Sequence, residues 1–523
     1  MGGLSCAFQT YAKANSPELG PGKWNEDEDR SYLLQMDISS MYPYIMTMPM
    51  PASSGETLSL PEDRAERLAW VKQQLEKIDF KRSDETECLL FVVDFSFPCH
   101  LHDYLDWAPP CKMTVEPELL SEYSRKVMQE NGLTPGKVAK LVPFLGRHCK
   151  EGVDGKRLAF MVQIMGARIE RVHEAIRFKC VPFLSAWMKG IYDERLLMKK
   201  QKRTVEAEML KLVMNAIYGK LIQNVEGFKN SQVYTSSSSF VRAANGRRMK
   251  DMDVFFGEDE FLGVVHSVDK QVRQKSLVQA GWRVLELSRL QMLMNHYLGM
   301  KHLFPDAVVT LTDTDSAHYF IKADRDPLLE LALANEDEPG RWPCFFDLAK
   351  DLVGKPGAIE TALSHLTAPQ LSIARARAGE LGGFGVEHLP RRVWEEINLR
   401  AKLYSTRFND DADEQKSKGI VKRARPKHEA YRETMATGIE QAASFSVLQS
   451  RQFILAVAQL SKKALSPLND KVFQLSALEN RPLGHWRNHE MLAKVAEHPN
   501  LGIESLAFQK IMIFLLGRAD VVR

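Results

Sequence analysis

The chain of 523 residues lacks several features that would place it in a class at once. Its seven cysteines include no Cys-x-x-Cys pair, which argues against zinc modules and iron–sulfur clusters and indicates a reduced, intracellular chain. A Cys99–Cys111 disulfide is the alternative that the spacing leaves open. The chain has no apolar run of about 18 residues and no signal-peptide pattern, so we expect neither membrane insertion nor secretion.

The chain also has little excess charge of either sign, because its 70 basic and 67 acidic residues leave a net charge of only +3. This total does not indicate nucleic-acid binding, but two local clusters can neutralise phosphates. One comprises Lys199, Lys200, Lys202 and Arg203, and the other is an acid-free stretch from Lys416 to Lys427. A solvated surface run is the alternative for each cluster. With 44% hydrophobic residues, the chain is long enough to form more than one lobe.

Two acidic motifs are present. Asp313-Thr314-Asp315-Ser316 lies between two β-type runs, 307–311 and 317–321, and Asp37 opens an earlier segment that ends at Pro43. Carboxylates at positions i and i+2 of a strand–turn–strand lie on one side, where they can face a third carboxylate on a neighbouring strand. Such a cluster holds paired divalent cations for phosphoryl transfer. A polar turn is the alternative for either motif read alone.

A third motif lies between these two. Lys211, Asn215 and Tyr218 recur at i, i+4 and i+7 and therefore share one helical face. The face is polar and aromatic, which a core would not select, and an amphipathic helix with a solvated stripe is the alternative.

The order of these motifs resembles family B DNA polymerases, most closely the protein-primed branch. Leu399 to Ser405 resembles that family's Lys-x-Tyr element, and Lys416 to Ile420 the basic stretch after it. Residues 463–471 and 484–486 resemble polymerases of Maverick/Polinton-type elements and related DNA viruses or linear plasmids. Met1-Gly2-Gly3 resembles the end of a linker that follows an exonuclease domain, so we expect polymerisation without self-proofreading. A truncated gene product is the alternative.

The resemblance implies a role for each matching residue. Asp37 and Asp315 would hold two Mg²⁺ ions, for which Mn²⁺ could substitute, with the Ile38 carbonyl as a further ligand and Asp313 in support. Tyr42 would exclude the 2′-hydroxyl of ribonucleotides, and a core tyrosine is the alternative. The other nucleotide-binding residues would be Ser40, Met41, Arg195, Lys199, Lys211, Asn215 and Tyr218. The DNA-binding residues would be Gly219, Thr314, Ser316, Lys402, Tyr404, Lys416 and Lys418, with Lys402 and Tyr404 together on a strand.

The implied fold is α+β, a right-hand polymerase with an antiparallel palm sheet, helical fingers and a mostly helical thumb. We expect palm at 1–55 and 276–425, an insertion resembling a terminal-protein-binding region at 56–150, fingers at 151–227, a second insertion at 228–275 and thumb at 426–523. Finger helices are expected near 182–200 and 205–223, and a buried helix at 281–297. Residues 324–383 have no counterpart and are expected to be an insertion or a poorly ordered linker, and the thumb to be helical through Gln459.

The partners implied are primer–template DNA, deoxynucleoside triphosphates, a terminal protein primer and a separate exonuclease chain, with no membrane. The site of action, nucleus or viral replication site, is left open. Two residues depart from the family's pattern: Ala216 replaces a serine and Leu311 a tyrosine, and neither is a metal ligand. Two alternatives remain, an inactive DNA-binding polymerase fragment, and an RNA polymerase or reverse transcriptase that shares the palm.

Overall fold

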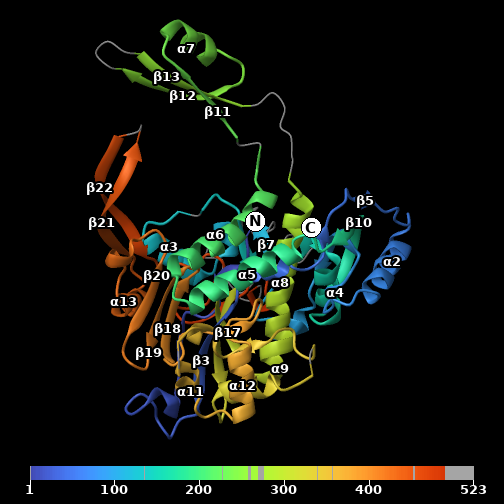
Figure 1. Cartoon of the computed structure of the whole chain (residues 1–523), viewed down its shortest axis with the longest axis vertical. Helices are drawn as coiled ribbons and strands as arrows, with labels where there is room; N and C mark the ends of the chain where they lie inside the picture. The colour runs from blue at the N-terminus through green and yellow to red at the C-terminus, as the bar shows by residue number, and fades with distance from the viewer. Residues whose placement is uncertain are drawn as a thin grey trace, which may run out of the picture. The chain divides into compact units, whose positions relative to one another are not determined.

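The computed structural model describes residues 2–134, 136–225, 228–256, 261–268, 276–338, 340–355, 357–451 and 454–488. The chain forms two compact units, and Figure 1 labels many of their elements. The larger unit takes residues 1–215, 283–444 and 461–523, and the smaller takes 216–282 and 445–460. The pairs of strands are antiparallel with a single parallel exception among those described, and helices accompany the sheets, as an α+β fold requires.

A ten-stranded sheet is the centre of the larger unit. Its main path runs β1 (Ser5–Ala7), β14 (Val308–Asp313), β15 (Ser316–Lys322), β3 (Ser31–Ile38), β18 (Val393–Arg400), β19 (Leu403–Phe408) and β20 (Asp413–Ser417). β2 (Tyr11–Lys13) pairs with β18, β17 (Phe384–Val386) with β3, and β16 (Phe346–Asp347) with β17. β3 is buried along almost its whole length and carries the apolar residues Tyr32, Leu33, Leu34, Met36 and Ile38. This register sets Asp37 opposite Ser316 on one side and Gly385 on the other.

A second sheet of the larger unit comprises β4 (Met50–Pro51), β5 (Glu56–Thr57), β6 (Glu87–Ser96), β9 (His148–Asp154) and β10 (Arg168–Val181). β6 lies in the predicted 56–150 insertion and β10 in the predicted fingers, so these two segments share one sheet. Its helices are α2 (Arg64–Glu76) and α4 (Gly155–Gln163), and the Asp63 and Asp154 side chains cap their first turns. Nearby segments form α3 (Glu122–Glu130), the pair β7 (Pro110–Met113) and β8 (Lys140–Pro143), and the pair β23 (Phe473–Gln474) and β24 (Asn480–Arg481).

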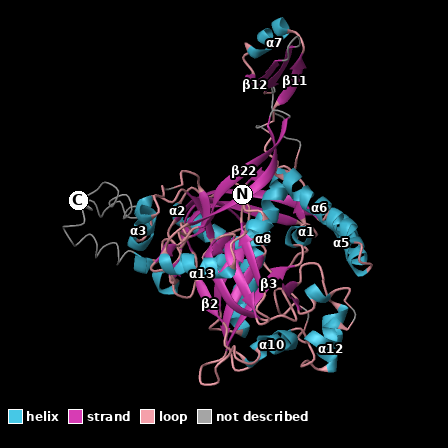
Figure 2. Cartoon of the chain, turned by 90° about the vertical axis from the view of Figure 1, so that its left-hand side faces the viewer, coloured by secondary structure: helices cyan, strands magenta, loops and turns pink. Residues whose placement is uncertain are grey.

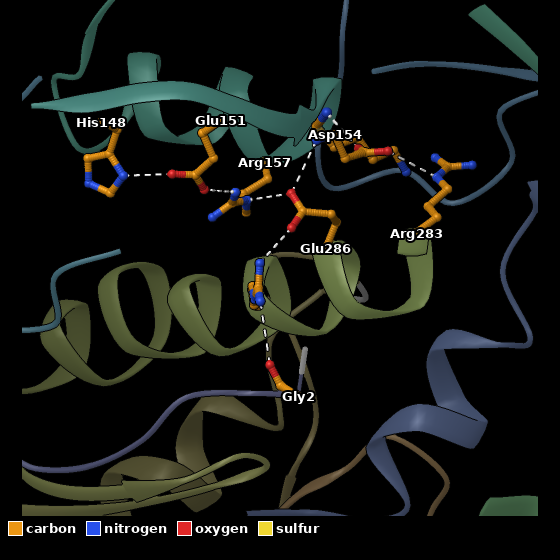
Figure 3. A network of polar contacts seen from close by, with 9 residues as sticks. Gly2, His148, Glu151, Asp154, Arg157, Arg283 and Glu286 are labelled. Atoms are coloured by element: carbon orange, nitrogen blue, oxygen red, sulfur yellow. Dashed lines mark hydrogen bonds and ion pairs between the residues drawn. The ribbon is translucent and has the colours of Figure 1, made fainter. Parts of the chain in front are cut away.

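Helix α8 (Val278–Met294) continues into a π-helical turn, Asn295–Met300, and α9 (Lys301–Leu303). The predicted stripe of Val284, Leu287, Leu290, Met294 and Tyr297 is buried, so the expectation of a core helix is confirmed. The same helix carries buried charges, which are tied to α4 and β9 by the chain of ion pairs in Figure 3. Buried charges are tolerated in a core only when they are paired in this way.

Two consecutive helices occupy the predicted fingers, α5 (Ser185–Lys200) and α6 (Thr204–Leu221), close to their expected bounds. The short helix α1 (Met41–Ile45) follows β3 directly.

For residues 324–383 the alternative of a poorly ordered linker is wrong, because the described part of this segment is built of regular elements, and the alternative of an insertion stays a prediction. It forms α10 (Pro327–Ala334), β16, α11 (Ala358–Ala362) and α12 (Ala368–Ala376). Asp326 caps α10, and Thr367 with Gln370 forms a capping box on α12. The Ala, Arg and Pro content that suggested a linker instead reflects short capped helices packed beside the sheet.

The expectation of a mostly helical thumb is also wrong for the described residues. After residue 425 the described chain has the α-helix α13 (His428–Thr437), which Gly438 ends with a positive φ of 71°, and a helical stretch at 486–488. The chain then forms β21 (Gln441–Arg451) and β22 (Ile454–Leu465), which pair as a hairpin. Alanine, leucine and glutamine in this segment favour helix locally, but pairing of the two runs overrides that preference.

The smaller unit contains a three-stranded sheet ordered β11 (Asn230–Tyr234), β13 (Phe261–Ser267) and β12 (Met249–Phe256). Helix α7 (Ser237–Ala244) lies on this sheet, as Figure 2 shows. Phe240 from α7 is buried and meets the Phe261 ring with centroids 5.3 Å apart, so the module has a core of its own. The predicted loop or hairpin insertion at 228–275 is therefore a folded β-sheet with a helix in its described part.

All seven cysteines are free, so the Cys99–Cys111 disulfide is not formed. Among the described residues, no helix is both long and apolar enough to cross a membrane.

Candidate active site

The sheet brings Asp37 and Asp315 together at the end of β3. Asp315 follows β14 in a turn in which Thr314 has a φ of 77°, and its carbonyl accepts a hydrogen bond from the Ile38 N–H at 2.9 Å. Burial, followed by the charge of Asp37, raises the pKa of Asp315 to about 7. Burial also raises the pKa of Asp37, although the Lys350 ammonium opposes this shift. Two partly buried carboxyl groups that repel one another are the electrostatic condition for holding a cation.

Asp313 is held away from that pair. Its Oδ1 accepts a hydrogen bond from the Ser5 hydroxyl at 2.6 Å and lies 2.7 Å from the Lys402 ammonium. Among the described residues, no three His, Cys, Asp or Glu side chains gather closely enough to hold a metal ion. The expected three-carboxylate cluster is thus reduced to two, because Ser5 and Lys402 take the third. The supporting role of Asp313 stays a prediction.

A lysine that the sequence did not single out contacts the acidic pair. The Lys350 ammonium makes an ion pair with the Asp37 carboxylate, lies 3.2 Å from the Asp37 carbonyl oxygen and 3.7 Å from Glu387. Lys350 lies in the segment that was expected to be an insertion or linker. The only local signal was Asp347, which begins the turn before it, and such turns are too common to identify a site.

More cations surround the acidic pair on α5 and α6. The Arg195 guanidinium donates to the Ser40 hydroxyl at 3.2 Å, while its Nε is buried without a hydrogen-bond partner. Desolvation, together with the charges of Arg195, Lys211 and Lys350, lowers the pKa of Lys199. The four cations Arg195, Lys199, Lys211 and Lys350 are therefore close enough to repel one another. A bound polyphosphate would reduce this repulsion.

The residues after Asp37 that were predicted to bind the nucleotide differ in their exposure. Ser40 has a φ of 55° at the start of α1, and Met41 is buried, so the Met41 side chain is not available to a nucleotide. Tyr42 is partly exposed, and burial raises its pKa while a hydrogen bond from the Gly3 backbone opposes the shift. The charge of Asp315 also reaches it, so Tyr42 lies at the acidic pair and not in a remote core.

One of the predicted DNA-binding residues, Lys402, contacts Asp313. Lys402 occupies the turn between β18 and β19 with a φ of 61°, so the expectation that it shares a strand with Tyr404 is wrong. Tyr404 pairs with Lys416 across β19 and β20, and burial raises its pKa. Thr314 donates its N–H to the Leu4 carbonyl at 2.8 Å, and Ser316 pairs with Asp37.

A basic hollow of about 240 Å³ opens beside Lys402. One carboxylate, that of Asp470, is among its lining side chains. The cations that line it are Lys140, Arg400, Lys402, Lys418, Lys463 and Lys471. Four of these, Lys140, Arg400, Lys463 and Lys471, were not predicted individually as DNA-binding residues. Such an excess of positive charge suits phosphate groups.

Asn215 is exposed on α6, and Tyr218 and Gly219 follow it in the smaller unit. Their predicted contacts with the nucleotide and DNA stay predictions, as does the Ile38 carbonyl as a metal ligand.

No protein-family model and no curated protein match the chain. Among solved structures, an orthorhombic crystal form of Phi29 DNA polymerase is similar at 12% identity and a TM-score of 0.44, over 89% of this chain and 61% of that one. Phi29 DNA polymerase complexed with primer–template DNA is similar at 11% identity and a TM-score of 0.42, over 88% and 60%. The chain thus spans about three fifths of the length of these solved polymerases.

Proposed function

We propose that the protein is a template-directed DNA polymerase that adds deoxynucleotides to a primer 3′-hydroxyl. One observation carries the proposal: the charges of Lys350 and Lys211 act on Asp37 of the acidic pair, and Asp313, two residues before Asp315, contacts Lys402 of the basic hollow. A nucleoside triphosphate and the phosphates of a nucleic-acid strand are the two polyanions that such an arrangement would bring to one acidic centre. The motif order resembles that of family B polymerases independently of this geometry.

The acidic pair fits divalent metal ions. Its carboxyl groups are partly buried and mutually repelling, and the Lys350 ammonium contacts one of them. Oxygen ligands of this kind suit Mg²⁺, with Mn²⁺ as a substitute. When bound there, two such ions would lower the pKa of the attacking hydroxyl and neutralise the leaving oxygen.

The chain's own residues would do the rest. Lys199, Lys211 and Arg195 would bind the triphosphate and neutralise the departing pyrophosphate, since charge concentrates there in the transition state. Lys402, fixed by Asp313, would orient the primer end, and the basic hollow would hold backbone phosphates without reading bases. Tyr42 would exclude a 2′-hydroxyl beside Asp315.

Two finer proposals rest on the motif resemblance alone. Protein-primed replication of a viral or mobile element is one, with residues 56–150 as the surface for a terminal protein. A separate exonuclease chain as a partner is the other.

The test is primer extension by the purified chain with Mg²⁺ and deoxynucleoside triphosphates on a primed DNA template. We expect extension by the wild type and a loss of about a hundredfold or more in Asp315→Asn, since a carboxylate of the acidic pair becomes neutral. Ribonucleotides should be incorporated poorly by the wild type and better by Tyr42→Ala. Absence of extension by the wild type would favour an inactive fragment, and efficient use of ribonucleotides would favour an RNA polymerase.

A further inference from the structure

The Lys350 side chain reaches Asp37 across β17, at a position where the strand has a glycine. Its side chain crosses β17 at Gly385, which is the register partner of Asp37. A Cβ at Gly385 would lie 2.5 Å from Cδ, 2.9 Å from Cβ and 3.1 Å from Cγ of Lys350. Because contacts below 3.0 Å are not tolerated, no side chain larger than that of glycine fits here with Lys350 in place.

The backbone that presents Lys350 is also fixed. The Asp347 carboxylate is fully buried and accepts hydrogen bonds from the Ala349 N–H at 3.0 Å and the Gly379 N–H at 2.7 Å. This closes the turn just before Lys350, whose side chain is 15% exposed. Lys350 is therefore held in a fixed position, unlike an exposed lysine that pairs with a neighbouring carboxylate by chance.

A metal ion bound at Asp37 would, however, compete with the Lys350 ammonium for the same position. The Lys350 ammonium contacts the Asp37 carboxylate, and it also lies near Lys199. A divalent ion at Asp37 and Asp315 would repel this ammonium, because like charges a few ångströms apart destabilise one another in a partly buried site. The Nε of Arg195 is buried and has no hydrogen-bond partner, so this donor lacks an acceptor.

We propose that Lys350 exchanges partners during the reaction: it holds Asp37 in the free protein and moves to a phosphate oxygen of the incoming nucleoside triphosphate when a divalent cation binds Asp37 and Asp315. This inference rests on the proposed function, and it assigns to that function a fourth phosphate-binding cation. Lys350 thereby makes metal binding and nucleotide binding depend on one another. An ammonium suits this role, since it is a point charge on a flexible stem.

The first test measures Mn²⁺ binding without nucleotide or DNA, by the loss of the free-ion electron paramagnetic resonance signal. Lys350→Met should bind Mn²⁺ about tenfold more tightly than the wild type, because a competing cation is removed. Lys355→Met is the matched control, since it removes an exposed lysine of the same segment and should leave Mn²⁺ binding unchanged. Equal or weaker Mn²⁺ binding by Lys350→Met would overturn the proposal.

The second test measures binding of a deoxynucleoside triphosphate by equilibrium dialysis with saturating Mn²⁺. Lys350→Met should bind it about tenfold more weakly, and Lys350→Arg should retain most of the affinity because its charge remains. Nucleotide binding by Lys350→Met that equals the wild type would refute the exchange. Neither readout needs catalysis. A wild type that fails to extend primers would contradict the proposed polymerase activity, whereas the two binding measurements would still test the partner exchange of Lys350.

Gly385→Ala guards against a variant that merely fails to fold. It keeps the Lys350 charge but displaces its stem, so it should share the tighter Mn²⁺ binding of Lys350→Met. Circular dichroism of each variant reports whether the fold is intact. Mn²⁺ binding by folded Gly385→Ala that equals the wild type would show that the position of the ammonium does not matter.

Discussion

At the scale of single residues, the site depends on a glycine with no chemistry of its own. A Cβ at Gly3 would lie 2.8 Å from Cγ2 and 3.1 Å from Cα of Thr314, the residue between Asp313 and Asp315. The neighbouring Leu4 carbonyl accepts the Thr314 N–H, and the Gly3 backbone hydrogen-bonds to Tyr42. Gly3 therefore sets the distance between the N-terminal segment and the acidic turn.

We predict that Gly3→Ala lowers the rate of primer extension by about tenfold, since displacing a carboxylate by a few tenths of an ångström impairs positioning. Gly2→Ala is the matched control, because nothing lies within 4 Å of a Cβ there. Steady-state kinetics of both variants, with thermal melting as a check on folding, would measure the difference. Equal rates for the two variants would rule out a role for the close approach at Gly3.

At the scale of elements, a run of buried ion pairs joins β9 and α4 to α8 (Figure 3). His148 contacts Glu151 at 2.6 Å, Arg157 links Glu151 to Glu286 at 2.7 Å each, and Glu286 contacts Arg289 at 2.8 Å. Arg289 in turn donates to the Gly2 carbonyl at 3.4 Å. Residues of the second sheet are thus connected through α8 to the segment that touches Thr314 and Tyr42.

This network predicts a pH dependence of stability. Burial, the largest single effect, lowers the pKa of His148, but the Glu151 carboxylate and Cys111 together outweigh burial and raise the pKa from 6.5 to about 9. Because the folded value exceeds the ordinary one, the stabilisation is complete below pH 6.5 and is lost as the pH rises through 9. The free energy of unfolding should fall by on the order of 2 kcal/mol between pH 7 and about 9.5.

Urea titrations across this pH range would measure that fall. His148→Gln should be less stable than the wild type at pH 7, and the gap should close at high pH. A gap that stays constant with pH would mean that His148 is neutral in the folded protein.

At the scale of the whole molecule, the smaller unit has its own core, in which Phe240 and Val265 are buried. We predict that replacing residues 228–275 by a short glycine–serine linker leaves the unfolding of the larger unit nearly unchanged, because the buried contacts of that module are internal. Differential scanning calorimetry of the deletion variant is the measurement. A decrease of more than about 5 °C in the Tm of the larger unit would show that the two depend on one another.

Sequence alone was enough for what depends on local pattern. The β-type runs around Asp313 and Asp315, the two helices that carry Lys199 and Lys211, and the buried stripe of α8 follow from periodicity and turn chemistry. Patterns failed where pairing partners decide the outcome. The β21–β22 hairpin is made of residues that favour helix locally, and the capped helices of 324–383 carry too little periodicity to be recognised.

Tertiary structure alone decided which charges meet. Asp37 and Asp315 are 278 positions apart, and only the β3–β15 register makes them neighbours and raises their pKa values. Lys350 lies outside the motifs recognised in the sequence, and the six cations of the hollow come from four separate segments of the chain. Electrostatic effects depend on distance and burial, and neither is encoded by spacing along the chain. The sequence therefore determined the candidate acids, and the fold determined which of them are paired, and with which cations.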